Sequence, residues 1–496
     1  MLSGLDLLTS QIDTDNDLPV EMSFSILLFH KDLEQLARES SRVMSFWGGF
    51  NFQMAAERNI TFPSFWNSLP AMATSESIVN SFRFNTVPST CAVHFLPILG
   101  EWQGSATASM TLLSTRRGKP YIFDLFDPAN TNYSAVLYAE SGAGKSVLAQ
   151  QLATDHLSLG GILWILDIGY SYRKLCSLLG GEYIEFKRDS PVNCNPFLYV
   201  EDIDDSMEVL RTVIGKMIAP QMGLDDLQRG FVEEAIKSCW ARYNTTTTPT
   251  EIAEYLRKLS DPRAQDLATM MFPWTRQGSF GAWFQGSKPI DFNNQFTVLE
   301  MIDLREMPQL LDVLLVMLIN RINAKMRSDA MNPQRANKLI IADESWDLLN
   351  NEGTAKYLAA AARTLRKERG GIVPITQSVA DLYASPAGRA IASNAATQIV
   401  MSQKEESISY VREQKMLSLS DYWWDQLKTV HTRKGRFSEV MFINRTGVGI
   451  ARLQIDNYMQ AVYSTEGAAR TEILRDIDAG VPASEAIANY LERAEK

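Results

Sequence analysis

The chain is poor in the residues that build metal sites. It contains four cysteines and four histidines among 496 residues, and no two cysteines have CxxC spacing. Because structural zinc sites draw on clustered Cys and His ligands, this usage disfavours a structural zinc ion. We therefore expect reduced, buried thiols at all four cysteine positions, which are Cys91, Cys176, Cys194 and Cys239.

We expect no segment of the chain to enter or cross a membrane. Its first residues have no basic stretch and carry several aspartates, so they do not resemble a signal peptide. The most apolar run, Leu310–Ile319, is interrupted by Asp312 and is much shorter than the ~20 residues that span a bilayer. We expect a cytoplasmic protein whose association with a membrane is peripheral and made through a partner.

Positive charge is in deficit. The chain has 48 Lys and Arg against 58 Asp and Glu, which gives a net charge of −10. This balance argues against a broad nucleic-acid-binding surface, although a local basic patch is compatible with it. The apolar fraction of 45% is ordinary for a folded protein, and the length predicts two or more domains.

The strongest motif is the segment Ala139–Ser146. It follows a short apolar run, Ala135–Tyr138, and precedes a helical stretch, Val147–Ala153. A strand, a glycine-rich turn and a helix form a phosphate-binding loop (P-loop), because backbone N–H groups and the positive end of the helix face the phosphates. The first residue is Ala where the usual pattern has Gly. We predict that Lys145 contacts the β- and γ-phosphates of ATP and that the Ser146 hydroxyl holds Mg²⁺. The residues predicted to bind the nucleotide are Glu140, Ser141, Gly142, Ala143, Gly144, Lys145, Ser146 and Val147.

A second motif is the apolar strand Lys338–Ala342, which ends in the adjacent acids Asp343 and Glu344. The carboxyl end of such a strand faces the nucleotide crevice of a parallel sheet. We predict that Asp343 completes the Mg²⁺ shell and that Glu344 orients and deprotonates the attacking water. Paired acids at a strand end also occur as helix N-caps, and the P-loop favours the catalytic interpretation.

The segment Gly370–Ser378 predicts a further strand that ends in polar residues. In P-loop ATPases with an extra central strand, that strand lies between the P-loop strand and the acidic strand. Gln377 would then lie near the γ-phosphate and report its presence, with Thr376 assisting. The alternative is a strand end that polar side chains merely cap.

A basic run lies between these motifs, in Ala359–Arg369. Its composition favours a helix with Arg363 and Arg366 on one side, and we expect this helix to emerge near the active edge of the sheet. Either arginine, supplied by an adjacent subunit, could neutralise charge that develops on the transferred phosphoryl group. The alternative is a solvated helix face.

Nearly continuous apolar runs such as Gly161–Asp167 are typical of parallel strands covered on both faces. We therefore predict an α/β fold with a mostly parallel sheet. A strand is expected at Met22–Phe29 and a hairpin at Ser438–Ile455. The expected segments are an N-terminal α+β region (1–115), the first part of the core (116–200), an all-α insertion (201–285), the second part of the core (286–465) and a C-terminal helical tail (466–496).

Together the motifs resemble the conjugative ATPases of type IV secretion systems, and most of all the TraC-type members of F-like plasmids. These belong to the HerA/FtsK group of RecA-like motor ATPases. The resemblance runs from about residue 20 to the end. Beyond the nucleotide motifs it rests on Asp167–Tyr172, Asn195–Phe197, Gly278–Phe284, Ser438–Val440 and Tyr463–Thr465.

The resemblance implies a RecA-like P-loop core and a cytoplasmic ATPase that powers pilus assembly and the transfer of DNA or protein substrates. It also implies a homo-oligomer, commonly a hexamer, that lies at the inner membrane through components of the secretion channel. A coupling protein and pilin are further expected partners, and DNA binding is expected to be weak or indirect. Family members usually carry a longer N-terminal region, so we expect residues 1–115 to correspond to only part of it.

Two other functions are compatible with the same core. One is a DNA-pumping translocase or a motor similar to coupling proteins, although coupling proteins usually add transmembrane helices. The other is a nucleotide-gated scaffold that recruits partners without turnover. The presence of Lys145, Asp343 and Glu344 argues against the scaffold.

Overall fold

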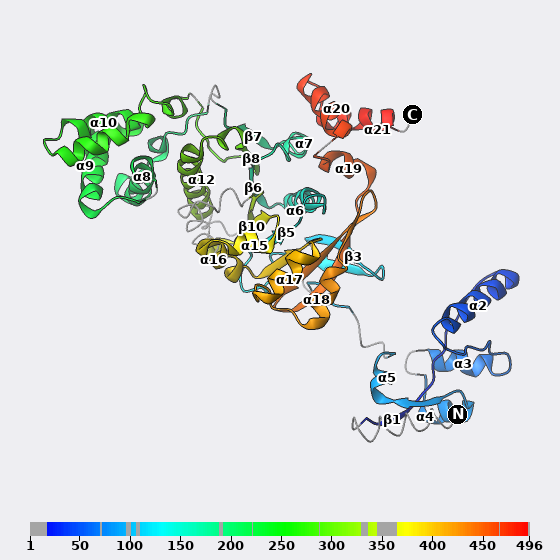
Figure 1. Cartoon of the computed structure of the whole chain (residues 1–496). Coiled ribbons are helices and arrows are strands. Elements are labelled where there is room, and N and C mark those ends of the chain that lie inside the picture. The colour runs from blue at the N-terminus through cyan, green and yellow to red at the C-terminus, as the bar shows by residue number, and fades with distance from the viewer. Residues whose placement is uncertain are drawn as a thin grey trace. The chain divides into compact units, whose positions relative to one another are not determined.

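The computed structural model describes residues 17–69, 72–95, 101–105, 110–187, 192–220, 222–286, 288–328, 336–344, 365–465 and 467–494. The chain forms two compact units, Met1–Glu101 and Trp102–Lys496 (Figure 1). The strand β3 (Thr111–Thr115) lies within the segment expected for the N-terminal region, but it pairs with β4 (Pro120–Phe123) and β14 (Gly447–Leu453) in the sheet of the larger unit. The larger unit therefore begins before the expected boundary at residue 115.

The smaller unit pairs β1 (Pro19–Met22) with β2 (Asn85–Pro88) in antiparallel register. Its helices are α2 (Leu33–Gly48), α3 (Thr61–Ser68), α4 (Ser75–Ser81) and α5 (Ser89–Val93). The prediction of a strand at Met22–Phe29 is wrong. Met22 pairs with Asn85, the first residue of β2, so β2 offers no partner to the residues that follow Met22. Phe24 instead packs edge-on against Trp47.

The larger unit is built on one sheet with, among the described residues, twelve strands in the order β4-β3-β14-β13-β11-β5-β10-β9-β6-β8-β7, with β12 paired to β13. The strands from β11 to β7 are parallel, and β13, β14, β3 and β4 add an antiparallel edge. The mostly parallel α/β architecture is confirmed. The other strands are β5 (Ala135–Tyr138), β6 (Ile162–Asp167), β7 (Glu182–Glu185), β8 (Phe296–Glu300), β9 (Lys338–Ala342), β10 (Gly370–Thr376), β11 (Thr397–Val400), β12 (Thr432–Arg433) and β13 (Phe437–Asn444).

Successive residues of each central strand face opposite sides of the sheet, so an unbroken apolar run buries both faces. In β5, Val136 and Tyr138 belong to one hydrophobic cluster, and Ala135 and Leu137 to the other. The second cluster is closed by α6 (Lys145–Ser158), α7 (Arg173–Leu178), α19 (Asn457–Tyr463), α20 (Gly467–Asp478) and α21 (Ala483–Ala494). The first is closed by α12 (Pro308–Ser328), α15 (Val379–Tyr383), α16 (Pro386–Asn394), α17 (Glu405–Glu413), α18 (Asp421–Lys428) and the helices of residues 203–270.

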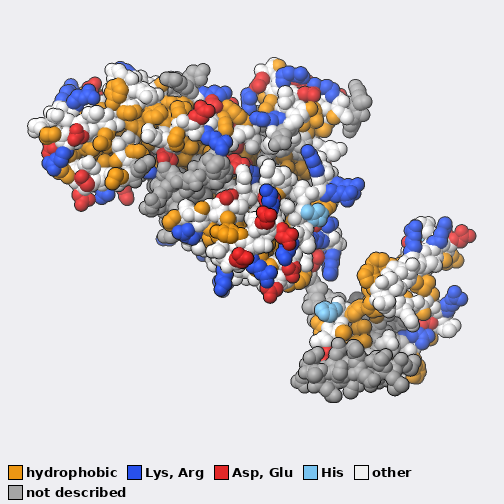
Figure 2. Space-filling view, in the orientation of Figure 1, with side chains coloured by type: hydrophobic (Ala, Val, Ile, Leu, Met, Phe, Trp, Pro, Cys, Tyr) orange, Lys and Arg blue, Asp and Glu red, His pale blue; other side chains and the backbone are white. Residues whose placement is uncertain are grey.

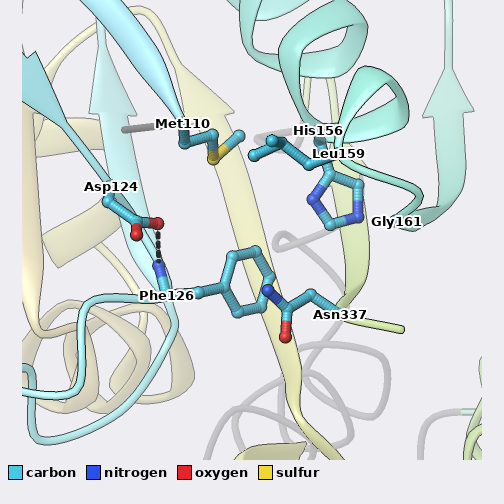
Figure 3. A pocket seen from close by; sticks show the side chains of 7 residues that line it. All are labelled: Met110, Asp124, Phe126, His156, Leu159, Gly161 and Asn337. Atoms are coloured by element: carbon cyan, nitrogen blue, oxygen red, sulfur yellow. Dashed lines mark hydrogen bonds between the residues drawn. The ribbon is translucent and has the colours of Figure 1, made fainter. Parts of the chain in front are cut away.

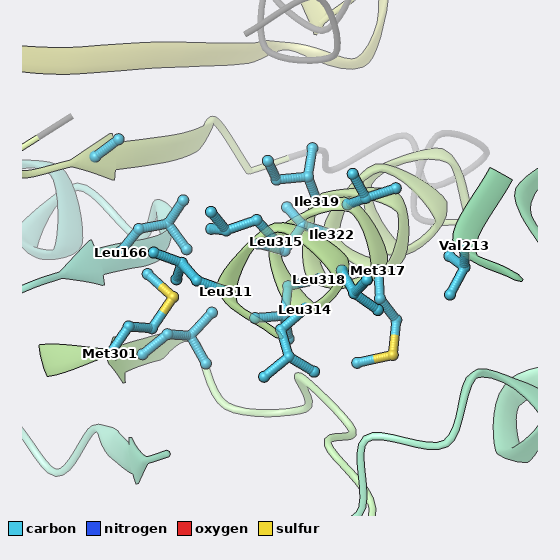
Figure 4. Close-up of a cluster of buried hydrophobic side chains, with 14 of the residues drawn as sticks. Leu166, Val213, Met301, Leu311, Leu314, Leu315, Met317, Leu318, Ile319 and Ile322 are labelled. Carbon is cyan, nitrogen blue, oxygen red and sulfur yellow. The ribbon is translucent and has the colours of Figure 1, made fainter. Parts of the chain in front are cut away.

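Helix α12 contains the most apolar run of the sequence, Leu310–Ile319, and every apolar residue of this run is buried because the run packs between two layers. Its side chains meet Leu166 of β6 and Met301, the residue after β8, on one side and Val213 of α8 (Ile203–Ile218) on the other (Figure 4). The run Leu310–Ile319 is therefore part of a helix that is buried in the protein core. None of the described helices combines the length and the hydropathy that a membrane-spanning helix needs.

Residues 203–270 form helices that pack on one another and on α12: α8, α9 (Asp226–Tyr243), α10 (Pro249–Lys258) and α11 (Pro262–Met270). Each begins at a side chain that accepts a backbone N–H, and α9 and α10 carry full capping boxes.

On the face shown in Figure 2, acidic and basic side chains of the larger unit are interspersed.

All four cysteines are unpaired. Cys176, Cys194 and Cys239 are buried as expected, whereas Cys91 is exposed. The expectation for Cys91 is wrong because it lies on α5 of the smaller unit, a short helix that buries none of its residues.

Candidate active site

The segment Ala139–Ser146 connects β5 to α6. Gly142 and Gly144 have φ of +81° and +93°, which residues with a side chain disfavour, and Gly144 directly precedes the first turn of α6. Ala139 has no positive φ, and its N–H donates to the Thr376 carbonyl of β10 at 3.0 Å. The loop therefore needs glycine at positions 142 and 144 but accepts the methyl group of Ala139.

The predicted phosphate-binding residues differ in exposure. Ser141 and Gly142 are exposed and Ala143 is buried, while Ser146 and Val147 are half-buried in the first turn of α6. Glu140 points away from this turn, because its carboxylate accepts a hydrogen bond from the Lys404 N–H at the start of α17 at 2.5 Å. The exposed tip leaves backbone N–H groups accessible to a ligand.

Lys145 and the acid pair meet although 199 residues separate Lys145 from Glu344 in sequence. The Lys145 ammonium forms an ion pair with Glu344 and lies 3.3 Å from Oδ1 of Asp343. Burial alone would lower the pKa of Lys145, but the charges of Asp343 and Glu344 outweigh it and raise that pKa. Lys145 is therefore a fully charged ammonium held between two carboxylates.

Asp343 is nearly fully buried and is fixed from several sides. Its N–H donates to the Leu166 carbonyl of β6 at 2.9 Å, and its Oδ1 accepts from the Glu344 N–H at 2.9 Å. The Tyr172 hydroxyl donates to Oδ2 at 3.0 Å. Glu344 has a φ of +51°, a strained value for a residue with a side chain, of the kind found at functional sites.

Two more carboxyl groups end the neighbouring strands. Asp167 of β6 lies opposite Glu300 of β8 in parallel register, and both are buried. Burial, together with the charges of Glu300 and Asp343, holds the pKa of Asp167 well above its usual range. Glu300 accepts from the Tyr170 N–H at 2.7 Å and from the Tyr183 hydroxyl at 3.1 Å. Asp343 therefore belongs to a row of strand-end acids.

The sequence pattern assigns no site role to Tyr172, Asp167 or Glu300, although Asp167–Tyr172 is one of the segments that carry the resemblance. The apolar run Gly161–Asp167 does end in a carboxylate, as Lys338–Ala342 does before Asp343. The order of β8, β6 and β9 that brings these ends together follows only from the fold. The contact from Tyr172 to Asp343 joins residues 171 positions apart.

The strand β10 lies between β5 and β9, which confirms the position predicted for an extra central strand. Its last residue, Thr376, is fully buried, and its hydroxyl donates to the Ser378 carbonyl at 3.0 Å. Gln377 follows with an exposed side chain. The backbone carbonyl of Gln377 accepts a hydrogen bond from the side-chain amide of Gln403 at 3.1 Å. The end of β10 thus reaches the start of the loop at Ala139, and the exposed side chain of Gln377 follows at the same edge.

The expectation that the basic run emerges near the active edge of the sheet is wrong for Arg366. Arg366 is exposed in a 3₁₀ turn, Leu365–Glu368, immediately before β10 begins at Gly370. Because β9 and β10 are parallel, the connection must return to the amino ends of the strands, the edge opposite Lys145. Arg363 lies outside the described residues.

A small cavity of about 150 Å³ also opens at this opposite edge, at the end of α6 and the start of β6 (Figure 3). It is lined by Met110, Asp124, Phe126, His156, Leu159, Gly161 and Asn337. None of these residues belongs to the P-loop or to the acid pair. The cavity is therefore separate from the candidate active site.

The residues at the active edge fit a nucleotide with Mg²⁺. Carboxylate and hydroxyl oxygens, as in Asp343 and Ser146, are the ligands that Mg²⁺ takes together with substrate phosphates. The positive φ of Gly142 and Gly144 and the helix start at Lys145 form an anion cradle.

Comparison with known proteins gives a consistent result. Residues 109–221 and 235–494 match the family described as the TraG P-loop domain. The chain is 25% identical over 472 residues to the protein TraC of Escherichia coli (strain K12). This alignment covers 90% of this chain and 53% of that protein. It is 22% identical over 359 residues to the type IV secretion system protein virB4 of Bartonella quintana (strain Toulouse), with 71% and 44% covered. The resemblance predicted from the sequence is confirmed.

Among solved structures, VirB4 of Thermoanaerobacter pseudethanolicus superposes with a TM-score of 0.60 at 20% identity, covering 72% of this chain and 100% of that chain. At this identity the likeness concerns the fold. The chain spans about half the length of the curated relatives it matches.

Proposed function

Because this chain belongs to the TraG P-loop domain family, we propose that it is a Mg²⁺-dependent ATPase whose site is the edge formed by Lys145, Asp343 and Glu344. The observation that carries the proposal is the position of the Lys145 ammonium between the two carboxylates. A lysine of the P-loop and the acids of β9 are the groups that hold and cleave a triphosphate.

We propose the following roles for the residues at this edge. Backbone groups of Glu140–Val147 and the Lys145 ammonium bind the phosphates of ATP, and Ser146 and Asp343 hold Mg²⁺. Mg²⁺, when bound, neutralises charge on the phosphate oxygens. Glu344 accepts a proton from the attacking water, for which it must first leave its ion pair with Lys145. Gln377, exposed at the end of β10, detects the γ-phosphate.

We propose further that hydrolysis powers type IV secretion, in conjugative pilus assembly and in the transfer of DNA or protein substrates. The support is the similarity to TraC and to proteins named for the type IV secretion system. The chain would work in the cytoplasm at the inner membrane, through channel components, a coupling protein and pilin, with only weak or indirect contact to DNA. Its ring would be a hexamer.

A ring also gives the arginines a role. Since Arg366 lies at the edge opposite Lys145 of its own chain, it could reach a phosphoryl group only in the site of a neighbouring subunit. Arg363, which lies outside the described residues, is the alternative arginine for this contact. A planar, permanently charged guanidinium suits such a contact.

The test is phosphate release from ATP by the purified chain, with and without Mg²⁺, over a range of protein concentrations and with added duplex or single-stranded DNA. We expect Mg²⁺-dependent release whose specific activity rises with protein concentration and is not strongly stimulated by DNA. Strong stimulation by DNA would favour a DNA-pumping translocase. Nucleotide binding without phosphate release would favour a scaffold.

A further inference from the structure

A short basic turn lies beside the P-loop. It connects β12 to β13 and presents Arg433, Lys434 and Arg436, all exposed. Within the part of the chain that the structure describes, none of these three cations pairs with a carboxylate, whereas the nearby Arg116 and Arg452 do. The turn therefore carries three positive charges that no described carboxylate neutralises, in a chain with a net charge of −10. They point to an anionic ligand.

The basic turn is held against the loop by two contacts. The Thr432 hydroxyl donates to the Ala143 carbonyl at 2.6 Å. Ser438 packs so closely on Gly144 that a Cβ atom at position 144 would lie 2.4 Å from the Ser438 hydroxyl oxygen. The hydrogen bond from Thr432 thus satisfies the carbonyl of Ala143. The turn and the loop are parts of one packed structure.

The strand β13, which follows the basic turn, is fixed independently by Glu439, a completely buried residue. Its carboxylate accepts from Arg116 at 2.6 and 3.0 Å and from Arg452 at 3.1 Å, and it lies 3.2 Å from Nδ1 of His431. Burial alone would raise the pKa of Glu439, but the guanidinium of Arg116 outweighs it and lowers that pKa. Because Glu439 is fully paired in this way, the cations of the basic turn are not needed to balance it.

The register of the sheet determines how far the basic turn extends beyond the carboxyl end of β5. Tyr138, the last residue of β5, pairs with Val400 of β11, and Val400 pairs with Met441 of β13. From Met441 the strand continues to Phe437, a rise of roughly 14 Å at about 3.4 Å per residue. The basic turn therefore stands beyond the end of β5, above the edge at which the P-loop lies. It flanks the loop on the side of β11, whereas Asp343 and Glu344 follow β9 on the other side.

We propose that Arg433, Lys434 and Arg436 form a second anion-binding element of the nucleotide site, which contacts the phosphates that ATP and ADP share. This inference rests on the proposed function. The γ-phosphate belongs to the side of Lys145 and the acid pair, so cations on the opposite side of the loop meet the rest of the nucleotide. Charge-assisted hydrogen bonds from guanidinium and ammonium groups to phosphate are among the stronger polar contacts in proteins.

The experiment uses the full chain and compares three proteins with the parent. Arg433→Gln removes one exposed guanidinium beside the loop, and the triple variant Arg433→Gln/Lys434→Gln/Arg436→Gln removes the whole cationic set. Arg445→Gln is the matched control, because Arg445 is exposed in the turn at the other end of β13. The dissociation constants of fluorescent ATP, fluorescent ADP and a fluorescent duplex DNA are measured for each, and thermal unfolding checks that the folded state is unchanged.

We expect the triple variant to bind ATP and ADP about tenfold more weakly or worse, by similar factors, as the loss of charge-assisted hydrogen bonds predicts. Arg433→Gln should show a smaller loss and Arg445→Gln none. Unchanged affinity in the triple variant overturns the inference. A loss for ATP alone also overturns it, since the cations would then contact the γ-phosphate. Unchanged nucleotide affinity with weaker DNA binding would assign the turn to nucleic acid instead. If the parent and Arg445→Gln bind neither nucleotide, it is the proposed function that fails.

Discussion

Replacing Glu344 by Gln separates hydrolysis from binding at the candidate active site. In the structure Glu344 forms an ion pair with Lys145, and the two side chains are 27% and 13% exposed. The substitution keeps the shape of the side chain but removes both the negative charge and the basic oxygen. The first change acts on nucleotide binding and the second on the chemical step.

The ion pair lowers the affinity for ATP, because Lys145 has to leave Glu344 to reach a phosphate. A partly exposed ion pair contributes about 1 kcal/mol, which corresponds to roughly a fivefold change in affinity. Asp343 lies 3.3 Å from the ammonium in the parent, so Lys145 should keep one acidic partner in the variant. We therefore expect Glu344→Gln to bind ATP as tightly as the parent or up to about fivefold more tightly.

For hydrolysis, the loss of a general base lowers kcat by about 10²-fold to 10⁴-fold. The assay measures phosphate release at saturating ATP, together with ATP affinity by fluorescence titration. The matched control is Glu185→Gln, since Glu185 also ends a strand of the same sheet and pairs with a lysine, Lys187. The control should keep the parent kcat. A parent-like kcat in Glu344→Gln, or a tenfold loss of ATP affinity, would refute this account of Glu344.

Three other predictions follow from the described contacts. Tyr172→Phe should raise the Mg²⁺ concentration needed for tight ATP binding by about tenfold, because it removes a hydrogen bond to the proposed metal ligand Asp343. The control Tyr463→Phe removes a hydroxyl that bonds Thr154 and should leave the Mg²⁺ dependence unchanged. Equal Mg²⁺ dependence in both variants would contradict this role of Tyr172. Burial lowers the pKa of His156 from 6.5 to about 4, so its contribution to stability is complete above about pH 6.5 and is lost as the pH falls towards 4. Between pH 7.5 and pH 5 the parent should lose about 2 kcal/mol more unfolding free energy than His156→Gln in denaturant titrations, and parallel losses would rule this out. If Arg366 acts across a subunit boundary, Arg366→Ala should bind ATP but hydrolyse it slowly, and mixing it with Lys145→Ala should restore part of the activity; a mixture no more active than its separate components would exclude that action.

The sequence predicts those parts of the site that depend on local pattern. The loop Ala139–Ser146 and the acids after β9 are each read from a few neighbouring residues, and a parallel sheet brings both to one edge. The place of β10 between β5 and β9 could be predicted for the same reason, since apolar runs and polar strand ends define the strand.

Contacts between distant segments could not be predicted in this way. Tyr172 reaches Asp343 and Arg116 reaches Glu439 only because the strand order and register bring them together. The position of Arg366 could not be predicted for a related reason. Nearness in sequence to the acid pair suggested nearness in space, but a parallel crossover returns the chain to the opposite edge. The extent of β1 likewise depended on its partner strand, which begins only at Asn85.

The measurement that tests the central claim most directly is Mg²⁺-dependent phosphate release from ATP by the parent chain and by Lys145→Ala under identical conditions. The account predicts steady release by the parent and a loss of about 10²-fold or more in the variant, accompanied by weaker ATP binding, because Lys145 is the cation that meets the phosphates. Equal release by both proteins, or no release by the parent at any protein concentration, would contradict it.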